Sequence, residues 1–432
     1  MRVHLRMLGC RLNQSEIDTM ARQFQQLGHE IVDDPARAEW FVVNTCAVTQ
    51  EATRKSRQLI RELNRANPAA RTTVTGCYAQ ISPDEIAVLP GVEGVVDNIA
   101  KEQLVEQVTG EAPPPFDTEP IERRAIPGAL GRTRAFVKVQ DGCNNVCTFC
   151  ITTVARGDGR SRAINDVLDE IGYLHGIGYQ EVVLTGVHLG SYGHDFGDKN
   201  ALQMLVRRIL DETDVPRLRL SSLEPWDLSD DFFMLWDNPR LCRHLHLPLQ
   251  SGCDATLKRM IRRTSQAEFR QLVRAARDAI PHLSITTDVI VGFPGETDDE
   301  FTISETFIRE MNFAGLHVFR YSKRPGTAAA RMSGHVDDAT KKERSTRLLT
   351  LSQEMERGFA QRFVGQTLPV LWEQVTGATE AGFINVGYTD NYVRVRGVHP
   401  RPLTNAITSA QIETFDEATG QLVALPMIDA VS

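Results

Sequence analysis

Three closely spaced cysteines constrain this chain more than any other feature. They are Cys143, Cys147 and Cys150, separated by three and then by two residues. This spacing brings three thiolates onto one loop and leaves one iron of a four-iron cluster without a protein ligand. Structural zinc is the alternative, but it requires four closed ligands, and no fourth cysteine or histidine follows in a knuckle pattern. We therefore predict a four-iron cluster with one open iron.

The residues before this loop predict a strand, and similar runs recur after it. Residues 135–139 alternate and are rich in strand-favouring residues. Amphipathic stretches separate the runs, which are Phe136–Val139, Glu181–Leu184, Leu218–Ser222, Leu245–Leu249, Thr286–Val291 and Leu316–Tyr321. Six βα units predict an open, partial (β/α)6 barrel with its site at the carboxyl ends of the strands. Polar residues and glycines at these ends either make turns or line that site.

The first 110 residues predict a small α/β domain with a parallel sheet. The expected strands are Val3–Leu8, Phe41–Val43 and Thr72–Thr75, with a helix capped by Asn13 and a capping box over Ser82–Glu85. Cys10, Cys46 and Cys77 each follow a strand and precede a helix. Because the carboxyl ends of parallel strands meet at one edge, these cysteines can form a second site there. Three unrelated buried thiols are the alternative.

The rest of the chain predicts a linker and a small β-barrel. Residues 111–132 are rich in proline and should be extended, and residues 133–364 contain the partial barrel. In residues 365–432, short strands are expected at Leu368–Trp372, Phe383–Val386 and Tyr392–Val395, separated by glycines. Two groups of basic and aromatic residues either bind RNA or are simply exposed on the surface. One is Arg156, Arg160 and Arg162, which can also meet a carboxylate, and the other is Tyr388, Tyr392, Arg394, Arg396 and Arg401.

Composition limits the remaining possibilities. The net charge of −8 gives no general support for nucleic-acid binding, so a local basic face would have to provide it. The sequence shows neither a signal-peptide layout nor an apolar run of membrane-spanning length, which predicts a cytoplasmic protein without a membrane partner. Eight cysteines in such a protein indicate metal ligands or buried thiols rather than disulfides. Cys242 and Cys253 lack ligand spacing, and His244 and His246 are expected to be core or hydrogen-bonded residues.

The cysteine loop resembles that of the radical S-adenosylmethionine enzymes, and the whole chain resembles the tRNA methylthiotransferases. The segments Gly9–Glu16, Asn44–Thr49 and Val74–Gln80 are most similar to the branch that acts on N6-threonylcarbamoyladenosine. Ile151-Thr152-Thr153 departs from relatives, which often have a proline there. The resemblance implies an N-terminal cluster domain, a radical barrel and a C-terminal TRAM domain.

The resemblance also implies cofactors and residue roles. Cys143, Cys147 and Cys150 would hold a [4Fe-4S] cluster that splits S-adenosylmethionine to a 5′-deoxyadenosyl radical, and Cys10, Cys46 and Cys77 a second, auxiliary [4Fe-4S] cluster. Candidates for contacts to S-adenosylmethionine are Thr185, Gly186, Ser222, Glu224 and Gln250. The implied reaction replaces the C2 hydrogen of the modified adenine with a methylthio group.

The expected partners are tRNA containing N6-threonylcarbamoyladenosine, a reductant such as a flavodoxin or ferredoxin, and a sulfur source. Two other substrates stay open within the family, namely N6-isopentenyladenosine in tRNA and an aspartate of a ribosomal protein. From another class, a non-catalytic iron–sulfur protein that binds RNA or transfers electrons is the alternative. Six barrel units with an open-iron spacing argue against it.

Overall fold

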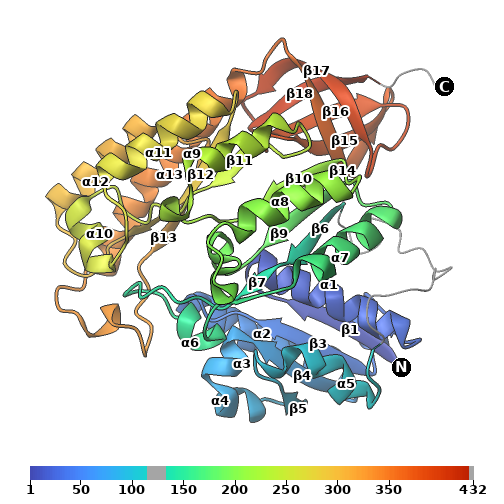
Figure 1. Ribbon diagram of the computed structural model, residues 1–432. Helices are drawn as coiled ribbons and strands as arrows, with labels where there is room; N and C mark the ends of the chain where they lie inside the picture. The colour runs from blue at the N-terminus through green and yellow to red at the C-terminus, as the bar shows by residue number, and fades with distance from the viewer. Residues whose placement is uncertain (114–132, 428–432) are drawn as a thin grey trace.

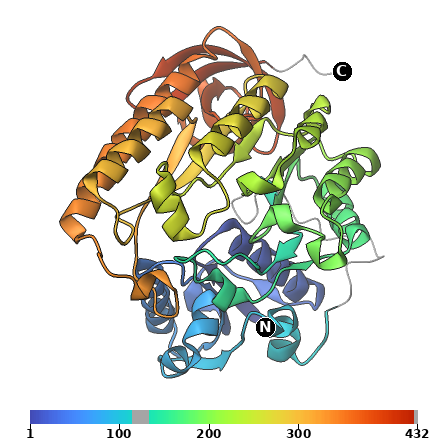
Figure 2. The same ribbon diagram turned by 60° about the vertical axis from the view of Figure 1, so that its left-hand side comes forward.

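A computed structural model describes residues 1–113 and 133–427 (Figure 1). The predicted linker, residues 111–132, therefore lies almost wholly outside the described residues. In both views the N-terminal domain, in blue, lies at one end of the molecule and the C-terminal barrel, in red, at the other (Figures 1 and 2). The two halves of the central domain lie between them. Among the helices of the described ranges, none has the length and apolar character needed to cross a bilayer.

The N-terminal domain contains a five-stranded, fully parallel sheet in the order β2-β1-β3-β4-β5. Its central strand β3 is buried because Phe41, Val42 and Val43 pack between helices on both faces. The strands are β1 (Arg2–Met7), β2 (Glu30–Ile31), β3 (Trp40–Thr45), β4 (Arg71–Gly76) and β5 (Val92–Val95). The helices are α1 (Arg11–Gln26), α2 (Gln50–Ala66), α3 (Cys77–Ile81), α4 (Pro83–Ala87) and α5 (Leu104–Thr109). The predicted parallel α/β domain is confirmed.

Two predicted helix caps in this domain are wrong. Helix α1 begins at Arg11, so Asn13 lies inside it. The Asn13 side chain instead donates to the backbone oxygens of Leu8 (2.7 Å) and Thr45 (3.1 Å), which ties together the loops after β1 and β3. Ser82 precedes α4 without a side-chain cap, although Pro83 occupies the first helical position as expected.

The central domain is an arc of six parallel strands. Strands β6, β9 and β10 form one sheet and β11, β12 and β13 another, and the bridges Leu218–Leu241 and Ser222–His246 join them. The strands are β6 (Arg134–Lys138), β9 (Glu181–Thr185), β10 (Arg217–Leu220), β11 (His244–His246), β12 (Ser284–Val291) and β13 (Gly315–Arg320). All six predicted strands are present, and the partial barrel is confirmed.

Helices cover the outside of this arc, where apolar side chains from both layers form the largest core. They are α7 (Ile164–Gly176), α8 (Ala201–Glu212), α9 (Asp230–Phe233), α10 (Asp254–Met260), α11 (Gln266–Ala279), α12 (Asp298–Met311) and α13 (Asp338–Gln361). The segment after β6 forms the short pair β7 (Gln140–Asp141) and β8 (Arg160–Ser161), with helix α6 (Thr152–Arg156) between them. Long α13 leads into the last domain.

The C-terminal domain is a closed five-stranded barrel in the order β14-β15-β16-β18-β17. Its strands are β14 (Thr367–Thr379), β15 (Gly382–Thr389), β16 (Arg394–His399), β17 (Ile407–Asp416) and β18 (Gln421–Met427). The predicted small β-barrel is confirmed. Tyr392, expected to begin a strand, lies in the turn before β16 with a φ of 68°.

A buried ion-pair network fastens the N-terminal domain to the central one. Glu16 of α1 accepts from Lys101 (2.8 Å) and from Arg156 (2.9 Å), and Arg156 also donates to Asp141 (2.9 Å). Burial opposes ionisation of Glu16, but the charges of Lys101 and Arg156 hold its pKa well below the usual value. Arg156 follows the cysteine loop, so the network fixes one predicted cysteine site relative to the other.

Candidate active site with two cysteine groups

The loop with Cys143, Cys147 and Cys150 begins directly after β7, on the carboxyl side of β6. Gly142 makes this turn possible with a φ of 73°, and a Cβ there would lie 1.9 Å from the carbonyl oxygen of Asp158. The amide of Cys143 donates to the oxygen of Gly157 (3.0 Å), which closes the base of the loop. The structure thus places this loop where a barrel of this type holds its reactive groups.

Two basic side chains lie against the thiols of this loop. Nδ1 of His188 is 3.9 Å from Sγ of Cys143, and Nη1 of Arg262 is 3.8 Å from Sγ of Cys147. Burial raises the pKa of Cys147 and Cys150, whereas the Arg262 charge lowers that of Cys147. A nearby cation stabilises a thiolate, the form that binds iron. We call Cys143, Cys147 and Cys150 the loop trio.

Sequence reasoning missed His188 and Arg262. Burial lowers the pKa of His188, but hydrogen bonds to Asp227 (2.5 Å) and Cys143 raise it to about 10. Arg262 donates to Glu224 (3.0 and 2.5 Å) and to the oxygen of Pro248 (2.6 Å). His188 lies three residues after Thr185, which directly follows a predicted strand, and this position could have marked it as a candidate site residue. Arg262 follows α10, where nothing in the sequence marks it.

Cys10, Cys46 and Cys77 meet at the carboxyl edge of the N-terminal sheet; we call them the edge trio. Cys10 precedes α1, Cys46 follows β3, and Cys77 begins α3. Burial, together with the charges of the neighbouring Cys77 and Cys10, raises the pKa of Cys46 to about 11. The charge of Arg156 lowers the pKa of both Cys10 and Cys46. The fold therefore brings three thiols, which are soft metal ligands, close to the guanidinium group of Arg156.

Neither trio has the spacing of a single-ion site. Three thiolates on one zinc ion lie about 3.8 Å apart, from zinc–sulfur bonds near 2.3 Å in a tetrahedron. We compared the ligand atoms of His, Cys, Asp and Glu side chains within residues 1–113 and 133–427. In that part of the chain, three such atoms lie within 4.8 Å of one another only at His246, Asp288 and His317. Neither trio meets this criterion for a single ion, whereas the ligands of a multi-iron cluster bind different iron atoms.

The strand-end residues predicted to contact S-adenosylmethionine lie around the same end of the barrel. Glu224 accepts a hydrogen bond from Arg262, which contacts Cys147, and the charge of Glu224 raises the pKa of Cys147. Gln250 adopts a φ of 71°, a strained conformation for a residue with a side chain. Thr185 is buried and donates to the oxygen of Val137 (3.1 Å), next to Gly186. These roles, and that of Ser222, stay predictions.

The arginines after the cysteine loop bind carboxylates of the protein itself. Arg156 holds Glu16 and Asp141, as described above, and Arg162 donates to Glu170 (2.6 Å). The side chain of Arg160 is 47% exposed and 3.9 Å from Asp141, so it alone of the three retains a solvent-facing charge. Of the roles that the sequence left open for these arginines, contact with a carboxylate therefore applies to Arg156 and Arg162, and the carboxylates belong to the protein itself.

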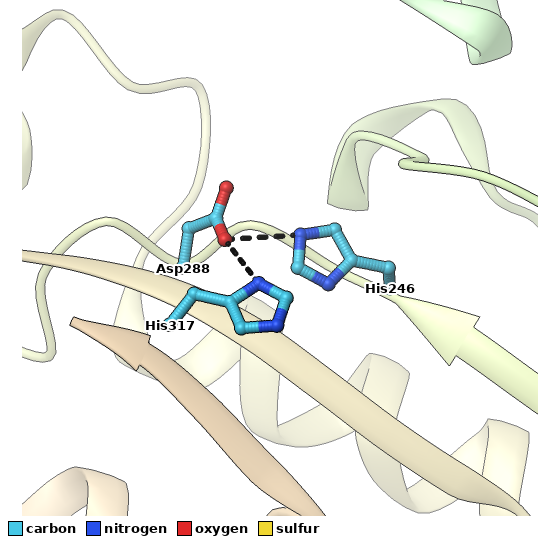
Figure 3. A group of neighbouring side chains, drawn as sticks. All are labelled: His246, Asp288 and His317. Carbon is cyan, nitrogen blue, oxygen red and sulfur yellow. Dashed lines mark hydrogen bonds and ion pairs between the residues drawn. The ribbon is translucent and has the colours of Figure 1, made fainter. Parts of the chain in front are cut away.

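A polar column lines the inner face of β11, β12 and β13. His244 and His246 both contact the hydroxyl of Thr286 (3.2 and 2.9 Å), so the prediction of hydrogen-bonded histidines is confirmed. His246 and His317 converge on one oxygen of Asp288 at 3.2 and 3.1 Å (Figure 3). Cys242 and Cys253 are buried in the central domain.

Comparison with known proteins supports this reading. Residues 2–97 match the protein family described as "Uncharacterized protein family UPF0004", and residues 137–307 match the radical SAM superfamily. The threonylcarbamoyladenosine tRNA methylthiotransferase MtaB of Bacillus subtilis (strain 168) is 41% identical over 90% of this chain and 88% of its own. The chain belongs to the radical SAM tRNA methylthiotransferases. It is therefore an enzyme, and the predicted family resemblance is confirmed.

Further relatives match this chain at lower identity. MtaB of Thermotoga maritima is 37% identical over 91% of this chain and 90% of its own. The tRNA-2-methylthio-N(6)-dimethylallyladenosine synthase of Acetivibrio thermocellus is 32% identical over 88% and 82%. Among solved structures, the radical S-adenosylmethionine methyltransferase TsrM of Kitasatospora setae covers 76% of each chain with a TM-score of 0.56 and 17% identity. That likeness shows the shared fold.

Proposed function

We propose that this methylthiotransferase acts on N6-threonylcarbamoyladenosine next to the tRNA anticodon and inserts a methylthio group at C2. The observation that carries the proposal is the 41% identity to a relative of that name over 90% of this chain. The relatives named for dimethylallyladenosine reach 32% identity. The same proposal places the enzyme in the cytoplasm, with a flavodoxin or ferredoxin as reductant and a separate sulfur source.

The chain's own residues would hold the cofactors of this reaction. The loop trio fits a [4Fe-4S] cluster with an open iron, beside Glu224 and Gln250 as candidates for S-adenosylmethionine contacts. The edge trio fits a second [4Fe-4S] cluster. With S-adenosylmethionine, these groups supply radical chemistry at a carbon that acid–base catalysis cannot activate. His188 and Arg262 orient the loop thiols and balance their charge.

The C-terminal barrel is proposed as a TRAM-like domain that contacts the tRNA. Arg394 and Arg401 are exposed on it, whereas Arg396 is ion-paired with Asp416 (2.9 Å). Tyr388 and Tyr392 turn toward Arg134 of the central domain rather than outward. The basic surface of this barrel is therefore smaller than the sequence suggests, and phosphate contacts rather than base stacking would dominate it.

The substrate can be tested by nucleoside analysis of tRNA. In cells that lack this protein, tRNA should retain N6-threonylcarbamoyladenosine and lose its 2-methylthio derivative. Loss of the methylthio isopentenyl derivative instead would assign the enzyme to the sister branch. Liquid chromatography with mass detection of digested tRNA separates these outcomes, and a plasmid copy of the gene provides the control.

Cluster content can be tested on purified protein. Anaerobic reconstitution should load two four-iron clusters and so about eight irons per chain. A Cys46→Ala protein should hold about four, because only the edge trio loses a ligand. Bound zinc, or four irons in both proteins, would contradict the two-cluster proposal.

A further inference from the structure

Four arginines gather where the start of α1 meets the amino ends of the first barrel strands. Arg11 directly follows Cys10 and begins α1, Arg134 begins β6, and Arg217 and Arg219 lie on β10. We call these four residues the arginine cluster. Residues from all three domains meet here, because Tyr388 and Tyr392 of the C-terminal barrel cover the cluster.

Within the described ranges, Arg11 is the member of this cluster without a carboxylate at ion-pair distance. Arg219 and Arg217 share Glu181 (2.7 and 3.8 Å), and Arg134 pairs with Glu373 (2.5 Å). Asp390, which lies nearby, is held by Arg243 (2.6 Å). Four guanidinium groups thus face two carboxylates. A buried charge without a partner is costly, so this excess favours binding of an anion.

Tyr392 holds Arg11 in place. Nη2 of Arg11 contacts the Tyr392 hydroxyl at 3.3 Å, which also accepts from Arg134 at 2.8 Å. Guanidinium carbons of Arg11, Arg134 and Arg219 lie 5.6, 5.2 and 4.6 Å from the ring centre. The φ of 68° is strained for an aromatic residue, and such strain persists where the surroundings enforce it, often at ligand sites.

The neighbouring histidine adds a second unused polar group. The His244 ring lies 4.9 Å from that of Tyr392, and within the described residues its buried Nδ1 has no hydrogen-bond partner. Burial, followed by the charges of Arg219 and Arg11, holds the pKa of His244 well below its usual value. His244 is therefore neutral and can donate or accept without adding charge.

We propose that Arg11 binds the free carboxylate of the substrate's N6-threonylcarbamoyl group and thereby selects it over an uncharged N6 substituent. This inference rests on the proposed function. An arginine fork matches a carboxylate in shape and charge. Arg11 directly follows Cys10 in the chain, so a carboxylate held by Arg11 would bind to the domain that carries the edge trio. An isopentenyl group carries no charge and would leave Arg11 unpaired.

The test compares two substrates in an Arg11→Gln variant, which keeps hydrogen-bonding capacity but loses the charge. One substrate is tRNA bearing N6-threonylcarbamoyladenosine, and the other is the same tRNA with the threonyl carboxylate converted to an amide. For the natural substrate, kcat/KM should fall by about ten- to hundredfold. For the amide, it should change little. Arg11→Lys should recover part of the loss, and Arg37→Gln, at a 59% exposed surface arginine, is the control.

Three measurements make the result decisive. The iron content should match that of the wild-type enzyme, which shows that the adjacent Cys10 site is intact. The rate of tRNA-independent cleavage of S-adenosylmethionine should also match, which shows that the loop trio is intact. Equal losses on both substrates, or none, would overturn the role of Arg11 while leaving the proposed function standing. A wild-type enzyme that modifies isopentenyladenosine and not the threonylcarbamoyl substrate would overturn the proposed function, and this inference with it.

Discussion

Replacing Cys143, Cys147 or Cys150 with alanine is expected to abolish both 5′-deoxyadenosine formation and methylthiolated tRNA. These thiols share one loop, and an open-iron cluster has three protein ligands, so loss of any one removes the site where S-adenosylmethionine would bind. The neighbouring charges cannot compensate. His188 contacts Cys143 and Arg262 contacts Cys147, but neither side chain can replace a missing thiolate ligand.

The measurement is anaerobic incubation with a chemical reductant, followed by quantification of 5′-deoxyadenosine and of the modified nucleoside. Cys253→Ala is the matched control, because Cys253 is a buried thiol of the same domain with no role in either trio. It should retain both activities. Formation of 5′-deoxyadenosine by a Cys147→Ala protein that binds no iron at this loop would contradict the assignment.

The strands of all three domains were largely predictable because their apolar residues alternate or run continuously. The carboxyl-end position of each cysteine followed from the same pattern, since a parallel sheet brings its strand ends to one edge. The exceptions are instructive. The short strands β2 and β5 of the N-terminal sheet were not identified from sequence, and neither were β17 and β18 (407–416 and 421–427). Many residues of β17 and β18 face solvent, which weakens the apolar signal.

Features that depend on long-range contacts were not predictable. Asn13 has the sequence context of a helix cap, but its amide is used between two strand ends. Tyr392 has the appearance of an exposed RNA-binding aromatic residue, yet it contacts Arg11, more than 380 positions away. Arg262 reaches Cys147 across 115 positions. Each of these roles depends on contacts between segments that are distant in the sequence, and local sequence patterns carry no information about such contacts.

Replacing Cys10, Cys46 or Cys77 with alanine is expected to have a different result, in which S-adenosylmethionine is still cleaved but the tRNA is not methylthiolated. The edge trio belongs to a sheet with its own apolar cores, separate from the core of the central barrel. Loss of one thiol there should leave the barrel folded and the loop trio complete. Sulfur insertion should fail because the second cluster is missing.

The decisive variant is Cys46→Ala, since Cys46 is buried beside both other thiols of the edge trio. It should hold about four irons and form 5′-deoxyadenosine without 2-methylthio product. Cys253→Ala, which removes a buried thiol of the central domain that belongs to neither trio, should keep both reactions coupled. If Cys46→Ala retains its loop cluster and methylthiolates tRNA at the normal rate, the N-terminal cysteines are buried thiols. The need for a second cluster would then be refuted, because sulfur would reach C2 without it.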